Sequence, residues 1–214
     1  MILNIFKPPG PTSFSIVKSI RKITGEKKVG HGGTLDPFAE GVLIIGTGRD
    51  TKKLGKISDS DKTYCATLTL GSMTDTHDPE GKIIKTKEVP RFKEKALLET
   101  LSTFLGKTLQ VPPMYSAKKI NGQRLYKLAR KNISVKRQPI TINIKEIKLI
   151  DYDAKQIMFV VRCSKGTYVR VLGKNIAEKI GTVGHLSQLV RTKVGSYMIE
   201  ESQTVEVFNE LWKS

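Results

Sequence analysis

The spacing of apolar positions predicts three elements in the first third of the chain. Phe14 to Lys22 carries apolar residues at helical spacing, with Ser13 as a plausible N-cap and Gly25 as the stop, so we expect a short amphipathic helix. Thr63 to Leu70 alternates apolar and polar residues, which predicts a strand. The apolar run Val42-Leu43-Ile44-Ile45 suits either a buried strand or a helical turn, and periodicity does not choose between them.

The second half of the chain mixes helical and strand patterns. Glu94 to Leu105 and Val169 to Ile180 have helical spacing, whereas Ile140 to Leu149 and Ile157 to Cys163 alternate as strands do. Val183 to Leu189 leads into a further strand. Because helices and strands are mixed without a repeating βαβ rhythm, we predict an α+β fold.

Composition points to a polyanionic partner. The 214 residues hold 37 Lys and Arg against 20 acidic residues, a net charge of +17, which exceeds what solubility needs. No stretch approaches the apolar length of a transmembrane helix, and the N-terminus runs directly into Lys7-Pro8-Pro9-Gly10 without a signal-peptide pattern. We therefore expect one compact domain over residues 1–214, in the cytoplasm, with no membrane partner.

Several familiar constellations fail on spacing. Gly106-Lys107-Thr108 resembles the end of a phosphate-binding loop, but Leu101 stands where the first glycine is needed. Asp75 to Glu80 is more simply a hairpin connection than a metal loop. Paired Cys/His spacing and the HExxH and GxSxG motifs are missing, so we expect no metal site, no cofactor and no serine-hydrolase triad.

One loop is distinctive. The sequence Gly30-His31-Gly32-Gly33-Thr34-Leu35-Asp36-Pro37 carries a carboxylate among glycines, which let the backbone approach a ligand closely. Pro37 favours an extended conformation at Asp36 and helps to fix its backbone. An Asp-Pro dipeptide alone is more often a simple turn, so the assignment depends on the wider pattern.

Five separated motifs, in order, supply that pattern. In chain order they are Lys7-Pro8-Pro9-Gly10-Pro11-Thr12-Ser13, the Asp36 loop, Lys62-Thr63-Tyr64, Val111-Pro112-Pro113-Met114-Tyr115-Ser116-Ala117 and Cys163-Ser164-Lys165-Gly166-Thr167-Tyr168-Val169-Arg170. Together they closely resemble the TruB-type tRNA pseudouridine synthases, from residue 2 to about residue 199. The resemblance implies the pseudouridine synthase catalytic fold, a central mixed, mainly antiparallel sheet flanked by helices and RNA-binding loops.

The resemblance also implies the chemistry. Enzymes of this type convert the T-loop uridine at tRNA position 55 to pseudouridine, and their catalytic aspartate falls on Asp36. Asp36 could attack C1′, attack C6 of the base, or remove a proton from C2′ on the way to a glycal, and the sequence leaves these routes open. Arg170 is implied as the fixed cation that keeps Asp36 ionised, because burial would otherwise raise the pKa of the carboxyl. Tyr64 is implied as the ring that stacks on the flipped base and as a candidate for the final proton removal.

Further positions follow from the same resemblance as substrate contacts. They are His31, Leu189, Lys7, Tyr168, Lys118 and Lys119. Residues from about 111 to 139 correspond to an insertion that closes over the T-arm, and we expect it to be open or disordered without RNA. We also expect a monomer that lacks the C-terminal PUA domain of many bacterial relatives.

Two other classes of protein remain as alternatives. A non-catalytic RNA-binding protein would not need Asp36, Tyr64 and Arg170 together, since binding alone requires neither an acid nor its counter-cation. A basic nuclease would need a metal-binding acid cluster, which the sequence does not offer.

Overall fold

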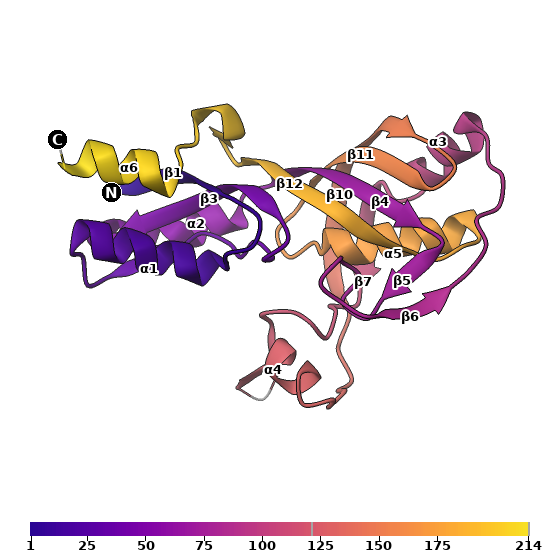
Figure 1. Cartoon of the computed structure of the whole chain (residues 1–214), viewed down its shortest axis with the longest axis horizontal. Coiled ribbons are helices and arrows are strands. Elements are labelled where there is room, and N and C mark those ends of the chain that lie inside the picture. Colours follow the sequence, from indigo (N-terminus) through magenta and orange to yellow (C-terminus); the bar gives the residue numbers. More distant parts are fainter. Residues whose placement is uncertain (121, 214) are drawn as a thin grey trace. The chain divides into compact units, whose positions relative to one another are not determined.

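A computed structural model describes residues 1–120 and 122–213 (Figure 1). Its main sheet has nine strands, seven of them in the order β1-β3-β12-β4-β11-β10-β7, with β2 paired to β3 and β13 to β12. The pairings of β1 with β3 and of β10 with β11 and β7 are antiparallel, and β12 runs parallel to β3. The fold is mixed α and β with a mainly antiparallel sheet, as predicted.

The chain divides into two compact units. Unit 1 comprises residues 1–65 and 189–214, and unit 2 comprises residues 66–188. The long strands β4 (Lys62–Leu70) and β12 (Gly184–Val194) each contribute residues to both units. The single catalytic domain expected from the sequence stays a prediction.

Unit 1 is built around β3, which is covered on both faces. Its elements are β1 (Ile2–Lys7), α1 (Ser13–Thr24), β2 (Val29–His31), β3 (Glu40–Thr47), the 3-10 helix η1 (Gly48–Lys53), α2 (Leu54–Asp59), β13 (Tyr197–Met198), η2 (Ile199–Glu201) and α6 (Val205–Lys213). Leu43 and Ile45 pack with residues of α1 and α6, whereas Val42 and Ile44 pack with Leu54 of α2. Burial on both faces explains the continuous apolar run and identifies it as a strand.

The predicted N-cap of α1 is wrong by one residue. Thr12 caps the helix, and its hydroxyl accepts a hydrogen bond from the backbone N–H of Ser15 at 3.0 Å. Ser13 lies inside the first turn, and its side chain bonds to the backbone of Leu35 instead. Gly25 ends the helix as predicted, with a left-handed φ of 68°.

Unit 2 packs two helices against the other half of the sheet. Its elements are β5 (Ser72–Thr74), β6 (Ile83–Thr86), α3 (Glu94–Ser102), β7 (Gly106–Gln110), β8 (Lys119–Ile120), β9 (Gln123–Arg124), α4 (Leu125–Ala129), β10 (Ile140–Tyr152), β11 (Gln156–Cys163) and α5 (Val169–Ile180). Helix α5 lies very close to the sheet at Gly173, where an added Cβ would meet the side chain of Leu186 at 2.7 Å. Helix α3 ends three residues earlier than predicted, and Gly106 begins a strand.

Candidate functional site

Asp36 lies on the loop between β2 and β3, partly exposed. The loop is fixed to α1 by the buried hydroxyl of Ser13, which donates to the carbonyl of Leu35 at 2.8 Å and accepts from its N–H at 2.8 Å. A turn follows, in which the N–H of Ala39 donates to the carbonyl of Asp36 at 3.2 Å. The backbone on both sides of the carboxylate is therefore hydrogen-bonded.

Lys7 lies beneath this loop with no exposed surface. Its ammonium donates to the carbonyls of Pro37 at 3.1 Å and Ala39 at 2.6 Å, and to that of Pro8 at 2.8 Å. Burying an ammonium is costly unless several acceptors surround it, so these carbonyls and Lys7 stabilise one another. The structure thus places Lys7 as a support of the Asp36 loop; its predicted contact with substrate stays a prediction.

Arg191 also supports the loop. It is 2% exposed, and its guanidinium donates to the carbonyls of Val42 at 2.7 Å, Thr34 at 3.1 Å and Gly33 at 3.2 Å. No ion pair to Arg191 is found within residues 1–120 and 122–213. The side chain is therefore held by backbone carbonyls before and after Asp36.

Gly41 permits this close approach of β3 and β12. Its φ is +106°, and a Cβ at this position would lie 2.3 Å from the backbone oxygen of Arg191. Sequence reasoning missed Arg191, although its spacing of two residues from Leu189 in a strand was a usable signal that both face the same buried side.

The other residues predicted in unit 1 are distributed over β2, β4 and β12. The N–H of Gly33 donates to Nδ1 of His31 at 3.3 Å, so this side chain belongs to the Asp36 loop. Leu189 and Tyr64 are buried, at 5% and 8% exposed, on β12 and β4. Their roles against a substrate stay predictions.

Arg170 belongs to unit 2, at the start of α5, and is 3% exposed. Its guanidinium forms an ion pair with the carboxylate of Asp78 at 3.3 Å. It also donates to the carbonyls of Thr76 at 2.6 Å and Tyr115 at 2.9 Å. Since Asp36 belongs to unit 1, the pairing of Arg170 with Asp36 stays a prediction.

Asp78 lies in the connection between β5 and β6, which is the hairpin expected from the sequence. Its Oδ1 accepts from the hydroxyl of Thr76 at 2.5 Å and from the N–H of Glu80 at 3.1 Å, so the carboxylate shapes the turn as well as pairing with Arg170. His77 beside it has a left-handed φ of 61°. Burial lowers the pKa of His77, and the charges of Lys174 and Arg170 lower it further.

Tyr168 is fixed through its backbone. Its N–H donates to the side chain of Gln110 at 2.8 Å, and its carbonyl accepts from the same amide at 3.1 Å. Gln110, at the end of β7, is 3% exposed. This paired contact fixes the backbone of Tyr168, which directly precedes α5 and is partly exposed.

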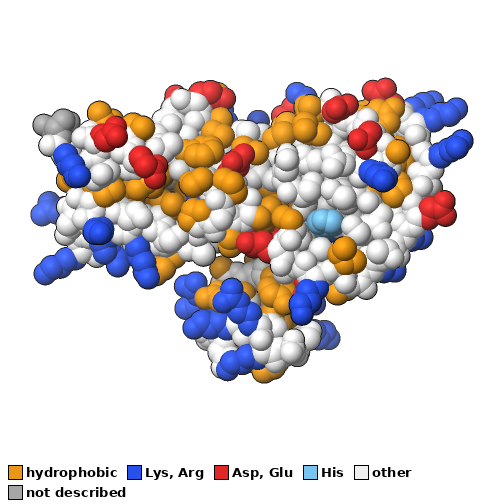
Figure 2. Space-filling view, in the orientation of Figure 1, with side chains coloured by type: hydrophobic (Ala, Val, Ile, Leu, Met, Phe, Trp, Pro, Cys, Tyr) orange, Lys and Arg blue, Asp and Glu red, His pale blue; other side chains and the backbone are white. Residues whose placement is uncertain are grey.

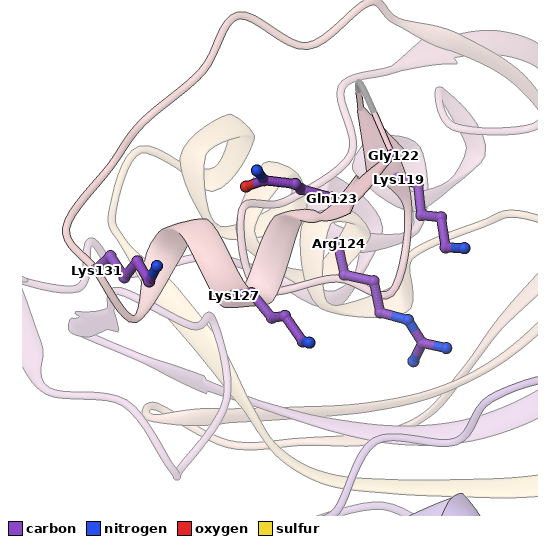
Figure 3. Close-up of a pocket in the computed structure, with 6 residues that line it drawn as sticks. All are labelled: Lys119, Gly122, Gln123, Arg124, Lys127 and Lys131. Carbon is purple, nitrogen blue, oxygen red and sulfur yellow. The ribbon is translucent and has the colours of Figure 1, made fainter.

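The insertion from about 111 to 139 contains β8, β9 and α4, and is anchored by the buried side chain of Leu125. It carries eight Lys and Arg residues and no acidic residue. A hollow of about 410 Å³ is lined by Lys119, Gly122, Gln123, Arg124, Lys127 and Lys131. Figure 3 shows the side chains of Lys119, Arg124 and Lys127 extending to the same side, which makes a strongly cationic surface.

Lys118 and Lys119 stand at the start of this basic surface. Lys118 is half-buried, and its carbonyl accepts from the N–H of Leu125. Lys119 is exposed and begins β8. An RNA contact by either residue stays a prediction.

The described residues show no cluster of three or more His, Cys, Asp or Glu that could hold a metal ion. Across residues 1–120 and 122–213, no helix combines the length and the apolar character needed to cross a membrane.

Solved structures with the same fold include Cbf5 in a Cbf5-Nop10-Gar1 complex. The match has a TM-score of 0.78 and 28% identity, and covers 100% of this chain and 55% of that chain. Cbf5 in an archaeal box H/ACA Nop10-Cbf5 complex matches with a TM-score of 0.71 and 26% identity, over 100% of this chain and 55% of that one. The chain thus spans about half the length of these proteins and has the pseudouridine synthase fold.

Sequence comparison narrows the class. A protein named tRNA pseudouridine synthase B from Caldanaerobacter subterraneus is 49% identical over 98% of this chain and 74% of that protein. One of the same name from Clostridium tetani is 45% identical over 98% of this chain and 72% of that protein. Residues 21–169 match the model of the TruB family pseudouridylate synthase N-terminal domain, and the chain belongs to this family.

Proposed function

We propose that this protein is a tRNA pseudouridine synthase that isomerises the T-loop uridine at position 55. Family membership supports the reaction class, and the proteins named tRNA pseudouridine synthase B support the substrate. The observation that carries the proposal is the placement of Asp36, on a loop whose carbonyls are held by the buried cations Lys7 and Arg191. Such a loop presents a carboxylate with little freedom to move, as catalysis by positioning requires.

The reaction needs a carboxylate and no redox partner. The bond from N1 to C1′ breaks, the uracil rotates, and a bond from C5 to C1′ forms; C5 loses a proton and N1 gains one. Asp36 serves as nucleophile at C1′ or C6, or as the base at C2′. Each role requires the ionised carboxylate, for which we propose Arg170 as the counter-cation. The ion pair of Arg170 with Asp78 fixes the orientation of its guanidinium.

The substrate uridine must leave the base stack before any of these attacks. We propose that Tyr64 stacks on the flipped uracil, that Leu189 lines the pocket for the base, and that His31 holds the loop of the RNA. Tyr168, Lys118 and Lys119 are proposed as further RNA contacts. Lys7 is proposed to act mainly through the loop that it supports.

Tritium release from C5-labelled uridine in a tRNA transcript tests the function. Wild-type protein, without added metal or cofactor, should release tritium, and Asp36→Asn should abolish the release while binding of the transcript persists. Asp151→Asn, which changes an exposed carboxylate of β10 in the same way, is the matched control and should behave as wild type. Binding without release by the wild type would favour the non-catalytic RNA-binding alternative.

The expected monomeric state, single catalytic domain and cytoplasmic location are part of the same proposal. Sedimentation equilibrium of the purified protein tests the monomeric state, and calorimetric unfolding tests the single domain. Fractionation of the source cells tests the location.

A further inference from the structure

A second basic surface lies in unit 1, outside the elements assigned to the reaction. It is formed by α1 from Lys18 onward, the turn after it, η1 and α2, and we call it the α1–η1 surface. Nine exposed cations belong to it: Lys18, Arg21, Lys22, Lys27, Lys28, Arg49, Lys52, Lys53 and Lys56. Figure 2 shows blue side chains gathered on the α1 side of unit 1, whereas red ones gather over α6.

Backbone contacts join the parts of this surface. The N–H of Gly48, at the start of η1, donates to the carbonyl of Lys28 at 2.7 Å. The guanidinium of Arg21 reaches the carbonyl of Val29 at 3.4 Å, which ties α1 to the strand after the turn. The cations from α1, the turn and η1 therefore form one continuous surface.

Acidic residues do little to neutralise it. Within residues 18–28 and 48–59 there are three acids, Glu26, Asp50 and Asp59. Asp50 already bonds to the N-terminal ammonium at 3.1 Å and to Lys53 at 2.7 Å. Nine cations against three acids leave an excess of like charge that repels itself, and a polyanion would relieve that repulsion.

The residue types favour the phosphate backbone of a duplex. Residues 18–28 and 48–56 contain no aromatic side chain, and the exposed ring of Phe14, earlier in α1, lies under the ammonium of Lys18 at 5.3 Å. Proteins that bind single strands use a series of aromatic rings to stack on the bases. Lysines and arginines on a helix and a turn suit contacts to phosphates that do not depend on sequence.

We propose that the α1–η1 surface binds the phosphate backbone of a helical segment of the same RNA whose uridine is modified, an inference that rests on the proposed function. Helix α1 joins the two regions: its first turn holds Leu35 of the Asp36 loop through Ser13, and Lys22 lies nine residues further on. At about 1.5 Å per residue this is roughly 14 Å, a length along which a duplex carries roughly eight phosphates. An RNA helix longer than the modified loop can therefore reach both regions.

Salt titration of RNA binding tests the proposal. The triple variant Lys22→Gln, Lys28→Gln and Lys52→Gln removes one cation from each part of the surface. A matched control, Lys93→Gln, Lys95→Gln and Lys155→Gln, removes three exposed lysines of unit 2. The probes are an intact tRNA transcript and the isolated T-arm hairpin, and the readouts are the slope of log affinity against log salt and the rate of tritium release.

For the intact transcript, the surface variant should lose about two to three units of slope, since each phosphate contact contributes roughly 0.7–0.9. Its affinity at moderate salt should fall about tenfold or more, and its release rate at saturating RNA should stay at the wild-type value. A smaller loss with the T-arm hairpin would locate the contact beyond the T-arm.

Equal salt slopes for the surface variant and the control would overturn the proposal. So would a surface variant that binds RNA as the wild type does but no longer binds vesicles of anionic phospholipid. A failure of the proposed function is distinguished by a different result, in which the wild-type protein binds the transcript without releasing tritium. In that case the salt slopes would still show whether the α1–η1 surface binds RNA.

Discussion

Arg191→Met removes the guanidinium that holds three carbonyls around Asp36 while keeping much of the buried side-chain volume. Each hydrogen bond from a charged donor contributes about 1.5–3 kcal/mol, and three would be lost. Removing a buried charge that is held only by carbonyls relieves several kcal/mol of desolvation cost. We expect a net loss of about 3 kcal/mol in the free energy of unfolding. For a chain of this size, that loss lowers the melting temperature by roughly 6–12 °C.

The effect on turnover should exceed the effect on binding. The carbonyls of Gly33 and Thr34 lie before Asp36 and that of Val42 lies after it, so the loop loses its support on both sides. A misplacement of a catalytic group by about 1 Å costs about 100-fold in rate. We expect kcat for tritium release to fall about 100-fold, with Kd for the transcript changed little.

The assay compares Arg191→Met, Arg191→Lys and Arg91→Met, measured well below their melting temperatures. Arg191→Lys keeps a cation that reaches some of the carbonyls and should recover part of kcat, while Arg91→Met, on the exposed surface, should match wild type. The reasoning is refuted if Arg191→Met keeps wild-type kcat although Asp36→Asn is inactive.

Three further predictions concern single residues. Gly41→Ala should lower the free energy of unfolding in urea by more than about 3 kcal/mol, because φ is +106° and the new methyl group would collide with the backbone oxygen of Arg191; an unchanged midpoint would contradict the described approach of the strands. Asp78→Asn should cost about 3–5 kcal/mol in thermal unfolding, since it breaks the buried ion pair between Asp78 and Arg170; a loss below 1 kcal/mol would show that the ion pair is not needed. The pKa of His77 is lowered in the folded chain, so the unfolded chain binds the proton at a higher pH and the free energy of unfolding should fall as pH drops below about 6.5. His77→Gln should flatten that part of the profile of stability against pH, and an unchanged profile would exclude His77 as the cause.

Local patterns predicted the elements with regular apolar spacing, such as α1, α5 and β4, but not α2, α4 or α6. Val169 to Ile180 was expected as a helix and is α5 with the same bounds, because its apolar spacing is helical and Gly181 takes a left-handed φ of 99° at its end. The alternation from Thr63 to Leu70 likewise identified β4. The run from Val42 to Ile45 stayed ambiguous because a strand buried on both faces has no period of two.

The supports of the site could not be predicted in the same way. Arg191 contacts Thr34 across 157 residues of sequence, and the hydrogen bond from Arg170 to Thr76 spans 94. A polar residue in a strand or a turn carries no local signal of a partner so distant. The resemblance to a family supplied Asp36, Tyr64 and Arg170, whereas Asp78 and Arg191 required the fold.

The long separation between Arg191 and the loop that it supports has a consequence for biosynthesis. Unit 1 is assembled from both ends of the chain, so the segment that carries Asp36 leaves the ribosome long before the strand that secures it. Since chains emerge at about 5–20 residues per second, the loop waits for roughly 8–30 s without its guanidinium. Competence for catalysis is then among the last properties that the nascent chain acquires, and a nascent chain truncated before β12 should carry every reacting group of unit 1 and still lack activity.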